Sequence, residues 1–278
     1  MADLGRSLTS QLRTLLLTTV YEASDGPKFE GHFAGDPLPS PEHIKVVSYN
    51  INLGLAIPQA IDAFQCHAPL QDADVILLQE MDEAGSEQMA RALGCNFVYF
   101  PGSVARHGRN FGNAILTRWR LSAPHKLILP YRHPINGVLR LAVRANVRIG
   151  DLDALVYSVH TETYTVPPFH RKAQVQAILD DIGEDAEFVI AGGDFNTVSG
   201  SSIRGIRQRF AGIGMARSSA GAGPTVAKFG TRPSAADHIF TRGFRKVASG
   251  KVEDAAASDH FPLWVTLRPT PKRPSSGP

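Results

Sequence analysis

The sequence predicts an α+β fold in which two β-sheets pack face to face and helices cover their outer sides. Short apolar runs rich in valine and isoleucine alternate with stretches of helical periodicity. The run RLAVRANVRI at 140–149 alternates apolar and polar residues, as a half-exposed antiparallel strand does. Hydrophobic residues make up 43% of the 278 residues, and no linker divides residues 44–268. We therefore expect one domain with a full core over that range.

The remaining strands are expected where β-branched and aromatic residues form short runs. In chain order these runs cover residues 44–50, 74–80, 96–100, 113–117, 154–160, 187–193, 237–241 and 263–268. Helices are expected between them, at 58–68, 83–93, 170–182 and 202–210. Pro167 and Pro168 support the start of the third helix, because Pro is favoured in the first turn.

Residues 1–43 are expected to form an amphipathic helix followed by a linker rich in Gly and Pro. Leucines and a valine recur every four residues from Leu8 to Val20, which is the spacing of one helix face. Packing on the domain is favoured over binding to a membrane surface, because the polar face is not strongly basic. Residues 269–278 are expected to form a disordered tail.

No apolar run approaches the ~20 residues that a membrane-spanning helix needs. The apolar N-terminal run is short and interrupted by Arg13, which does not resemble a signal peptide. We therefore expect a cytoplasmic protein without a transmembrane segment, and we expect a monomer.

The net charge of +3 conceals a segregation of charge. Residues 88–150 contain ten Arg or Lys and no acidic residue, and residues 201–250 contain nine with Asp237 as the only acid. The arginines could lie on separate solvated faces. They could also flank a site for an anionic substrate such as a nucleic acid.

Polar residues stand where the expected strands begin or end. A carboxylate or imidazole beside an apolar run is costly unless it is exposed, paired or bound to a metal. Any single one could be an ordinary strand-end residue, but together they predict one site at one rim of the sheets. They are Asn50, Glu80, His160, Asp194, Asn196, Asp237, Asp259 and His260.

The residue types in this set favour a hard divalent cation. Carboxylate and amide oxygens dominate and no cysteine takes part, which favours Mg²⁺, or Mn²⁺ as a substitute, over zinc. The sequence contains neither a phosphate-binding loop of the GxxxxGK[ST] type nor a GxSxG nucleophile elbow. Nucleoside triphosphatase and serine esterase functions therefore lose their main support.

Ordered motifs identify a family resemblance. SYNINLG, LLQEMD, GNAILTR, SVHTE, GGDFNT, ADHIF and SDHFPL occur in the order found in the endonuclease/exonuclease/phosphatase superfamily. The resemblance covers residues 44 to 268 and implies a four-layer αββα sandwich with its site at the top of both sheets. The superfamily includes deoxyribonucleases, apurinic endonucleases, neutral sphingomyelinases and inositol-polyphosphate phosphatases.

The resemblance also implies which residues bind the metal and the water. Asn50, Glu80 and Asp259 match the metal-side residues. Asp194 and Asn196 match the pair that positions the attacking water and the phosphate oxygens. Asn52 stands where some relatives carry a second acidic group, so the number of metal ions stays open.

The histidines are implied to act on the phosphate and the leaving group. His260 matches a histidine oriented by Asp237, and His160 matches one that deoxyribonucleases and sphingomyelinases carry. Which of the two is the acid is left open. Two substrate-binding candidates are weaker: Arg140 could contact phosphate or be solvated, and Asn113 could bind substrate or serve the structure.

The resemblance implies an enzyme that hydrolyses phosphodiester bonds by in-line attack of water with Mg²⁺. The preferred substrate is DNA or RNA, because phosphate contacts dominate the affinity of basic proteins for nucleic acid. A sphingomyelinase-like phospholipid phosphodiesterase and a phosphomonoesterase are alternatives. A non-catalytic nucleic-acid-binding relative is a fourth possibility, and the complete set of site residues argues against it.

Overall fold

A computed structural model describes residues 19–35, 38–105, 108–226 and 233–270. The expected N-terminal helix lies outside these residues, except for its last predicted member. Val20 is not helical but forms a β-bridge with Ser103. The expected tail after residue 270 also lies outside the described residues.

The first sheet has seven strands in the order β1-β4-β5-β3-β2-β13-β12. Its central pair is parallel, with Asn50 opposite Gln79, and its other pairs are antiparallel. The strands are β1 (Phe29–Gly31), β2 (Ile44–Asn50), β3 (Val75–Met81), β4 (Asn96–Val104), β5 (Asn110–Thr117), β12 (Phe244–Lys251) and β13 (Leu263–Pro269).

The second sheet has six strands in the order β10-β11-β9-β8-β7-β6. Its parallel pair is β8 with β9, which places His160 opposite Asp194. The strands are β6 (Arg120–Arg132), β7 (Leu139–Ile149), β8 (Leu152–His160), β9 (Phe188–Asp194), β10 (Ala216–Arg217) and β11 (Asp237–Arg242).

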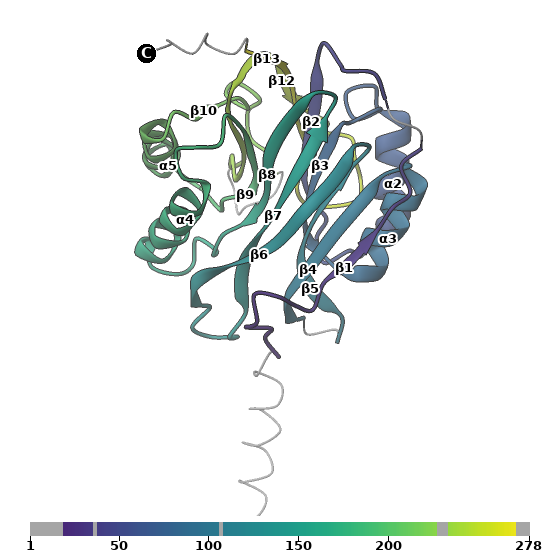
Figure 1. Ribbon diagram of the computed structural model, residues 1–278. Coiled ribbons are helices and arrows are strands. Elements are labelled where there is room, and N and C mark those ends of the chain that lie inside the picture. Colours follow the sequence, from purple (N-terminus) through teal and green to yellow (C-terminus); the bar gives the residue numbers. More distant parts are fainter. Residues whose placement is uncertain (1–18, 36–37, 106–107, 227–232, 271–278) are drawn as a thin grey trace, which may run out of the picture.

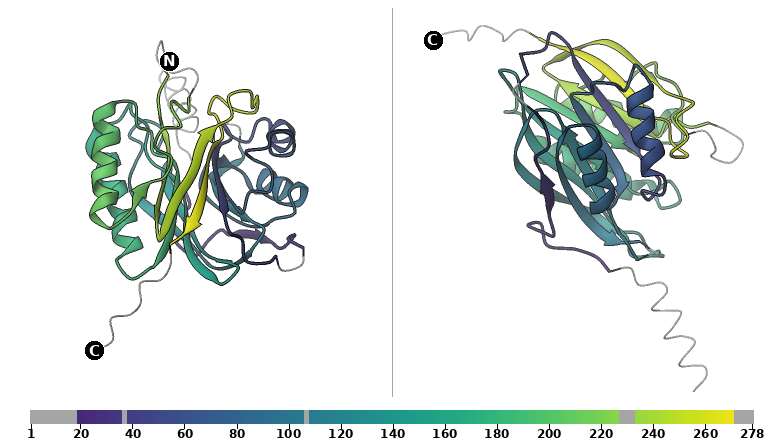
Figure 2. Two further views of the ribbon diagram at one scale, coloured as in Figure 1. Left: turned by 90° about the horizontal axis from the view of Figure 1, so that it is seen from above. Right: turned by 90° about the vertical axis from the view of Figure 1, so that its right-hand side faces the viewer.

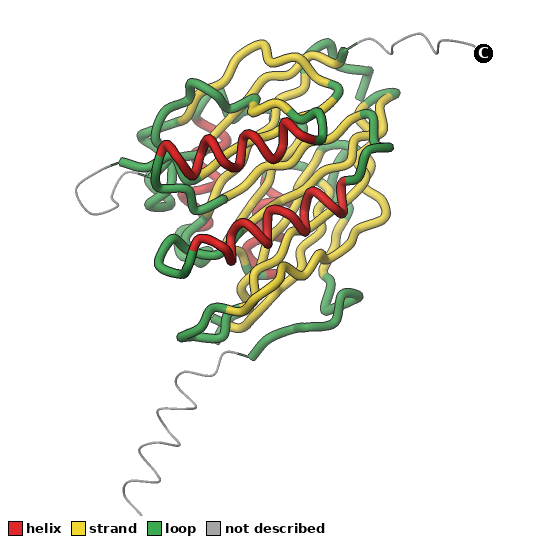
Figure 3. Tube along the Cα trace, turned by 90° about the vertical axis from the view of Figure 1, so that its left-hand side faces the viewer, coloured by secondary structure: helices red, strands yellow, loops and turns green. Residues whose placement is uncertain are grey.

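Helices cover the outer face of each sheet, as Figures 1 and 2 show. Helices α2 (Ile57–Cys66) and α3 (Glu83–Ala92) lie over the seven-stranded sheet. Helices α4 (Pro168–Ile182) and α5 (Gly200–Gly212) lie side by side over the six-stranded sheet (Figure 3). None of the described helices is long and apolar enough to cross a membrane.

Three apolar clusters hold the four layers together. The middle cluster joins the two sheets through residues such as Leu77 and Ile190. The outer clusters join each sheet to its helices, through Phe64 on one side and Phe210 on the other. Burial of these side chains, at ~25 cal/mol per Å² of apolar surface, is the main stabilising contribution. The predicted α+β sandwich is confirmed.

The prediction of strands was incomplete at the edges of the sheets. Strands β1, β6, β10 and β12 were not predicted, and each of them is an edge strand. Strand β1 lies inside the expected linker. The run at 140–149 is indeed antiparallel, but its first half is buried on both faces and only its second half alternates.

Candidate active site

The topology brings the predicted site residues to one end of both sheets. Asn50, His160 and Asp194 are the last residues of β2, β8 and β9. Asp237 is the first residue of the antiparallel strand β11 and lies opposite Asp194. His260 precedes β13, which runs antiparallel to β2. The ends of these buried strands therefore bring the candidate carboxylates and histidines together at one rim of the sandwich.

Two of these residues have left-handed backbone conformations. Glu80 has φ 59° at a bulge where the pairing of β3 with β5 shifts between Gln79 and Met81. Asn196 has φ 49° in the turn after β9. Residues other than glycine rarely adopt such angles, and strained residues concentrate at functional sites.

Asn50 connects two carboxylates from different sheets. Its amide nitrogen Nδ2 lies 3.3 Å from Oε1 of Glu80 and 3.2 Å from Oδ2 of Asp194. The other oxygen of Asp194 accepts a hydrogen bond of 2.8 Å from the backbone N–H of Asn196. The side chain of Asn196 is anchored in turn to the carbonyl oxygen of Thr161. These hydrogen bonds fix the turn after β9, so that Asp194 and Asn196, two residues apart, both lie at the candidate site.

His260 lies between two buried aspartates. Its Nδ1 forms a hydrogen bond of 2.9 Å with Oδ2 of Asp237, and its Nε2 lies 3.8 Å from Oδ2 of Asp194. Burial alone would lower the pKa of His260. The carboxylates of Asp237 and Asp194, the hydrogen bond to Asp237 and the charge of Asp259 outweigh burial and raise the pKa to about 10. His260 is therefore an imidazolium at neutral pH.

His160 faces the same carboxylate from the other side but has a cationic neighbour. Its Nε2 lies 3.6 Å from Oδ2 of Asp194 and 3.9 Å from Oε1 of Glu80. Nη1 of Arg140 lies 2.9 Å from the same Nε2 and 3.1 Å from Nδ1. Burial, Arg140 and His260 together hold the pKa of His160 well below its usual range. His160 is therefore neutral.

Asp194 is the buried carboxylate between the two histidines. Burial raises its pKa to about 6, and repulsion from Asp237 and Glu80 acts in the same direction. The charge of His260 and the hydrogen bond from Asn196 oppose this increase. A carboxylate with a raised pKa and a fixed orientation has the properties of a general base.

The residues expected on the metal side fit a hard cation. The side chain of Glu80 is 20% exposed and thus reachable, and Asp259 is exposed next to Ser258. Both offer oxygen donors, as Mg²⁺ requires. Ligand atoms of Asp194, Asp237 and His260 also lie within 4.8 Å of one another. His260 and Asp237 are already joined by a hydrogen bond. We therefore interpret them as a hydrogen-bonded pair that faces Asp194, and not as ligands of a metal ion.

The two weaker substrate-binding candidates, Arg140 and Asn113, have different environments in the structure. Arg140 is not solvated: it is only 7% exposed and lies 3.5 Å from Oε1 of the buried Glu162. Asn113 donates both amide hydrogens to carbonyl oxygens of Leu141 and Ser158 in the other sheet. These two hydrogen bonds link the two sheets, which favours a structural role for Asn113 over substrate binding.

Two buried residues near the site were not predicted. Glu162 lies inside the quoted SVHTE motif and is paired with Arg140. His238 follows Asp237, and its Nε2 lies 2.7 Å from Oγ1 of Thr197. Burial and Arg217 lower the pKa of His238 to about 3. A partner from another strand defines each environment, and such a partner is not visible in a single segment of sequence.

The sandwich and the carboxylates and histidines at its rim define a hydrolase site. The family model described as "Endonuclease/Exonuclease/phosphatase family" matches residues 47–260. The chain belongs to this family, whose members are hydrolases of phosphoesters and generally depend on a divalent metal. No curated protein matches the chain.

Solved structures share the fold at low sequence identity. An endonuclease/exonuclease/phosphatase from Beutenbergia cavernae is 21% identical, with a TM-score of 0.67 over 82% of this chain and 72% of that one. Humanized D. rerio TDP2 is 19% identical, with a TM-score of 0.64 over 82% and 100%. A mannosyl-6-phosphatase from Bacteroides thetaiotaomicron is 19% identical, with a TM-score of 0.58 over 81% and 99%. These likenesses show the four-layer fold.

Proposed function

We propose that this protein is a Mg²⁺-dependent phosphodiesterase that cleaves nucleic acid by in-line attack of water. The observation that carries the proposal is the arrangement around Asp194, which lies between a charged and a neutral histidine. Each partner of a hydrolytic reaction is thereby available at one place: a base, a cation for the phosphate and a second imidazole.

Asp194 is assigned as the residue that orients and deprotonates the water. Its oxygens are fixed by Asn50 and by the backbone of Asn196. Fixed orientation lowers the entropy cost of placing the water in line with the leaving oxygen. The side chain of Asn196 lies at the same turn and is assigned to the phosphate oxygens.

His260 is assigned to the phosphate. A phosphodiester is already anionic, and negative charge accumulates further on its equatorial oxygens during attack. An imidazolium held by Asp237 at 2.9 Å stabilises that charge without having to reorganise. Asp237 therefore acts as a positioning residue.

His160 is assigned to the other side of the reacting phosphate. As a neutral imidazole beside Arg140, it can donate a hydrogen bond from its ring N–H to a phosphate oxygen or to the leaving oxygen. This assignment favours His260, rather than His160, as the cationic group. The neighbouring Arg140 adds positive charge to the pocket without being exposed to solvent.

Glu80 and Asp259 would hold Mg²⁺, with Mn²⁺ as a substitute. Asn50 was expected to join them, but its Oδ1 accepts a hydrogen bond from the backbone N–H of Asn52 and its Nδ2 faces Glu80, so we assign it to orienting that carboxylate. When bound, the ion neutralises charge on the phosphate and the leaving oxygen. Glu80 is the residue we assign most directly to this role, because its reachable carboxylate stands at the bulge between Asn50 and His160.

Two observations support a nucleic acid as the substrate. The basic segments 88–150 and 201–250 supply Arg140, which contacts His160, and the arginines of α5, a helix that covers the outer face of the six-stranded sheet. One solved structure with this fold is D. rerio TDP2 complexed with a single-strand DNA product, with a TM-score of 0.61 and 17% identity. A mannosyl-6-phosphatase shares the fold as well, so a small phosphoester is the competing substrate.

The test is nicking of supercoiled plasmid by the wild type and by Glu80→Ala, with and without Mg²⁺. We expect nicking that EDTA abolishes and that Glu80→Ala lacks. Glu87→Ala is the matched control, since it removes a carboxylate from an exposed ion pair with Arg91 on α3. Hydrolysis of bis(p-nitrophenyl) phosphate without any nicking would overturn the nuclease and favour a smaller phosphoester.

A further inference from the structure

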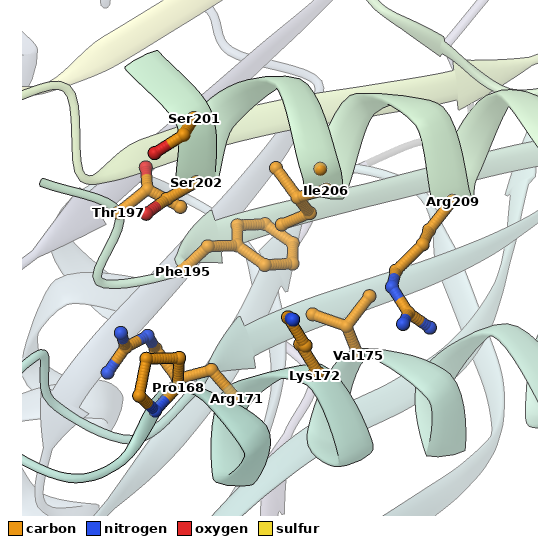
Figure 4. Close-up of a pocket in the computed structure, with 11 residues that line it drawn as sticks. Pro168, Arg171, Lys172, Val175, Phe195, Thr197, Ser201, Ser202, Ile206 and Arg209 are labelled. Atoms are coloured by element: carbon orange, nitrogen blue, oxygen red, sulfur yellow. The ribbon is translucent and has the colours of Figure 1, made fainter. Parts of the chain in front are cut away.

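A groove between α4 and α5 adjoins the turn that carries the site. Its volume is about 110 Å³, and its floor includes Val175, Phe195 and Ile206. Phe195 stands between Asp194 and Asn196 in the chain, so the groove begins directly behind the catalytic turn. Figure 4 shows side chains of both helices facing this space.

The charged residues that line the groove are all cationic. They are Arg171 and Lys172 on α4 and Arg209 on α5. Arg209 donates to the neutral Oε1 of Gln176, and Arg171 donates to the carbonyl oxygen of Thr163. Among the described residues, no carboxylate forms an ion pair with any of the three. An apolar floor lined by Lys172 and Arg209, together with Arg171, on which the charge of Glu162 also acts, is complementary to an anionic ligand that also has an apolar part.

An exposed aromatic cluster lies at the same turn of α4. Tyr131, at the end of β6, stacks on His170 with ring centroids 4.5 Å apart and an interplanar angle of 18°. Phe169 packs edge-on against both rings. Tyr131 remains 49% exposed and Phe169 54% exposed, although large aromatic side chains are normally covered. Flat, exposed rings provide surfaces on which a nucleobase can stack.

Buried hydrogen bonds connect the aromatic cluster to the catalytic centre. Gln174 donates to the carbonyl oxygen of Pro130, next to Tyr131, and accepts from the backbone N–H of Glu162. Glu162 in turn pairs with Arg140, which contacts His160. The cluster is thus held at a defined position relative to the reacting phosphate.

We propose that the first turn of α4 is a binding site for a single-stranded stretch of nucleic acid next to the scissile bond. Phosphates lie along Arg171 and Lys172 of this turn and Arg209 of α5, and a base stacks on Tyr131 and Phe169. This inference rests on the nuclease function proposed above and makes the substrate class more specific. Alternating phosphates and flat bases match both the cationic groove and the aromatic cluster.

The charge test compares two double variants with the same change in net charge. Lys172→Glu with Arg209→Glu alters the groove. Arg120→Glu with Arg245→Glu alters exposed residues at the far ends of β6 and β12. Binding of a fluorescein-labelled oligothymidylate is measured by anisotropy at several salt concentrations. We expect weaker binding by the groove variant, with a salt slope reduced by about 0.7 per lost phosphate contact, and near wild-type binding by the control.

The stacking test uses Phe169→Ala and Tyr131→Ala, with Val247→Ala on β12 as the control for removing an exposed apolar side chain. We expect each aromatic variant to bind the oligonucleotide roughly 5- to 100-fold more weakly without a change in salt slope. The ratio of kcat/KM for the oligonucleotide to that for bis(p-nitrophenyl) phosphate should fall in parallel. Melting temperatures establish that all variants are folded.

The other possible results contradict either this inference alone or the proposed nuclease function as well. If the wild type cleaves single strands and the groove and aromatic variants bind as their controls do, this inference is wrong and the nuclease function stands. If the wild type cleaves bis(p-nitrophenyl) phosphate but neither binds nor cleaves nucleic acid, both statements fail. Flotation with sphingomyelin vesicles that Phe169→Ala abolishes would replace the nucleic acid by a membrane surface.

Discussion

His160 and His260 are two buried histidines at nearly the same distance from one carboxylate, yet their charge states are opposite. Their Nε2 atoms lie 3.6 Å and 3.8 Å from Oδ2 of Asp194. The remaining ring nitrogen of His260 meets Asp237, whereas His160 meets Arg140. The pKa of His260 is raised and the pKa of His160 is lowered.

The difference shows that the second neighbour, rather than burial or Asp194, assigns the charge. Burial lowers the pKa of both imidazoles. Asp237 belongs to β11 and Arg140 to β7, on opposite sides of the parallel pair β8 and β9. The order of strands in one sheet therefore determines which histidine is cationic, and experiments that exchange these neighbours test the comparison.

The largest effect is expected from removing the carboxylate that both histidines face. Asp194→Asn keeps the shape of the side chain but cannot accept a proton from water. We expect kcat/KM for bis(p-nitrophenyl) phosphate to fall roughly 10²- to 10⁴-fold. The pKa of His260, followed by NMR, should also fall, because Asp194 contributes to its increase. A variant within twofold of wild-type activity would disprove the role of Asp194 as the base.

The next effect concerns the cationic histidine and its partner. His260→Gln should lower kcat roughly 10²- to 10³-fold, as loss of one group that stabilises transition-state charge does. Asp237→Asn should weaken activity through the same path. Since the two residues act as a unit, the double variant should be no slower than His260→Gln alone. Additive losses would show that Asp237 acts independently of His260.

Altering the neighbour of the neutral histidine should change stability rather than turnover. Arg140→Met alone leaves Glu162 buried without its partner, which should cost about 3–5 kcal/mol of unfolding free energy. Combining it with Glu162→Gln removes both charges and should cost less. In the double variant the pKa of His160 should be higher than in the wild type, yet still low because burial is the largest cause. An unchanged NMR titration of His160 would remove Arg140 from the explanation.

The smallest effect comes from a third histidine that serves as a reference. His238 is buried, no carboxylate in the described part of the chain pairs with it, and its pKa is lowered to about 3. A group whose folded pKa is depressed stabilises the fold above its unfolded pKa, near 6.5. That stability is lost as the pH falls from 6.5 towards 3, by up to ~1.4 kcal/mol per pH unit.

His238→Gln removes this titration and can still hydrogen-bond Thr197. Its unfolding free energy, measured with urea between pH 6.5 and 4, should therefore fall less steeply than that of the wild type. Parallel slopes for the two proteins would mean that His238 is protonated in the folded state. The metal is left out of these measurements, so that only the protein titrates.

Central strands were predictable from sequence and edge strands were not. β2, β3, β8 and β9 are buried on both faces, so apolar runs mark them. β12, with the sequence FRKVASGK, is buried only at its first residue and carries Arg245, Lys246 and Lys251. Edge strands are commonly polar because exposed apolar edges promote association. Periodicity therefore identifies the strands that form the core and overlooks those that border it.

The positions of the site residues were predictable because strand ends and motif order locate them. The burial and the charged neighbours of these residues were not predictable, since they depend on contacts between segments far apart in the sequence. Arg140 on β7 and Glu162, two residues after the end of β8, are 22 positions apart in the chain and form a buried ion pair. A solvated arginine was one of the two expectations for Arg140, and no local pattern distinguishes it from a buried one.

The left-handed backbone at Glu80 and Asn196 has a consequence for how this protein tolerates change. Each such conformation costs on the order of 1–3 kcal/mol and persists only because the surrounding structure enforces it. Selection for heat resistance alone would therefore favour substitutions at these two positions that relax the chain. Glycine at either position would relieve this strain but remove the side chain that the candidate site needs, so stability and activity oppose each other there.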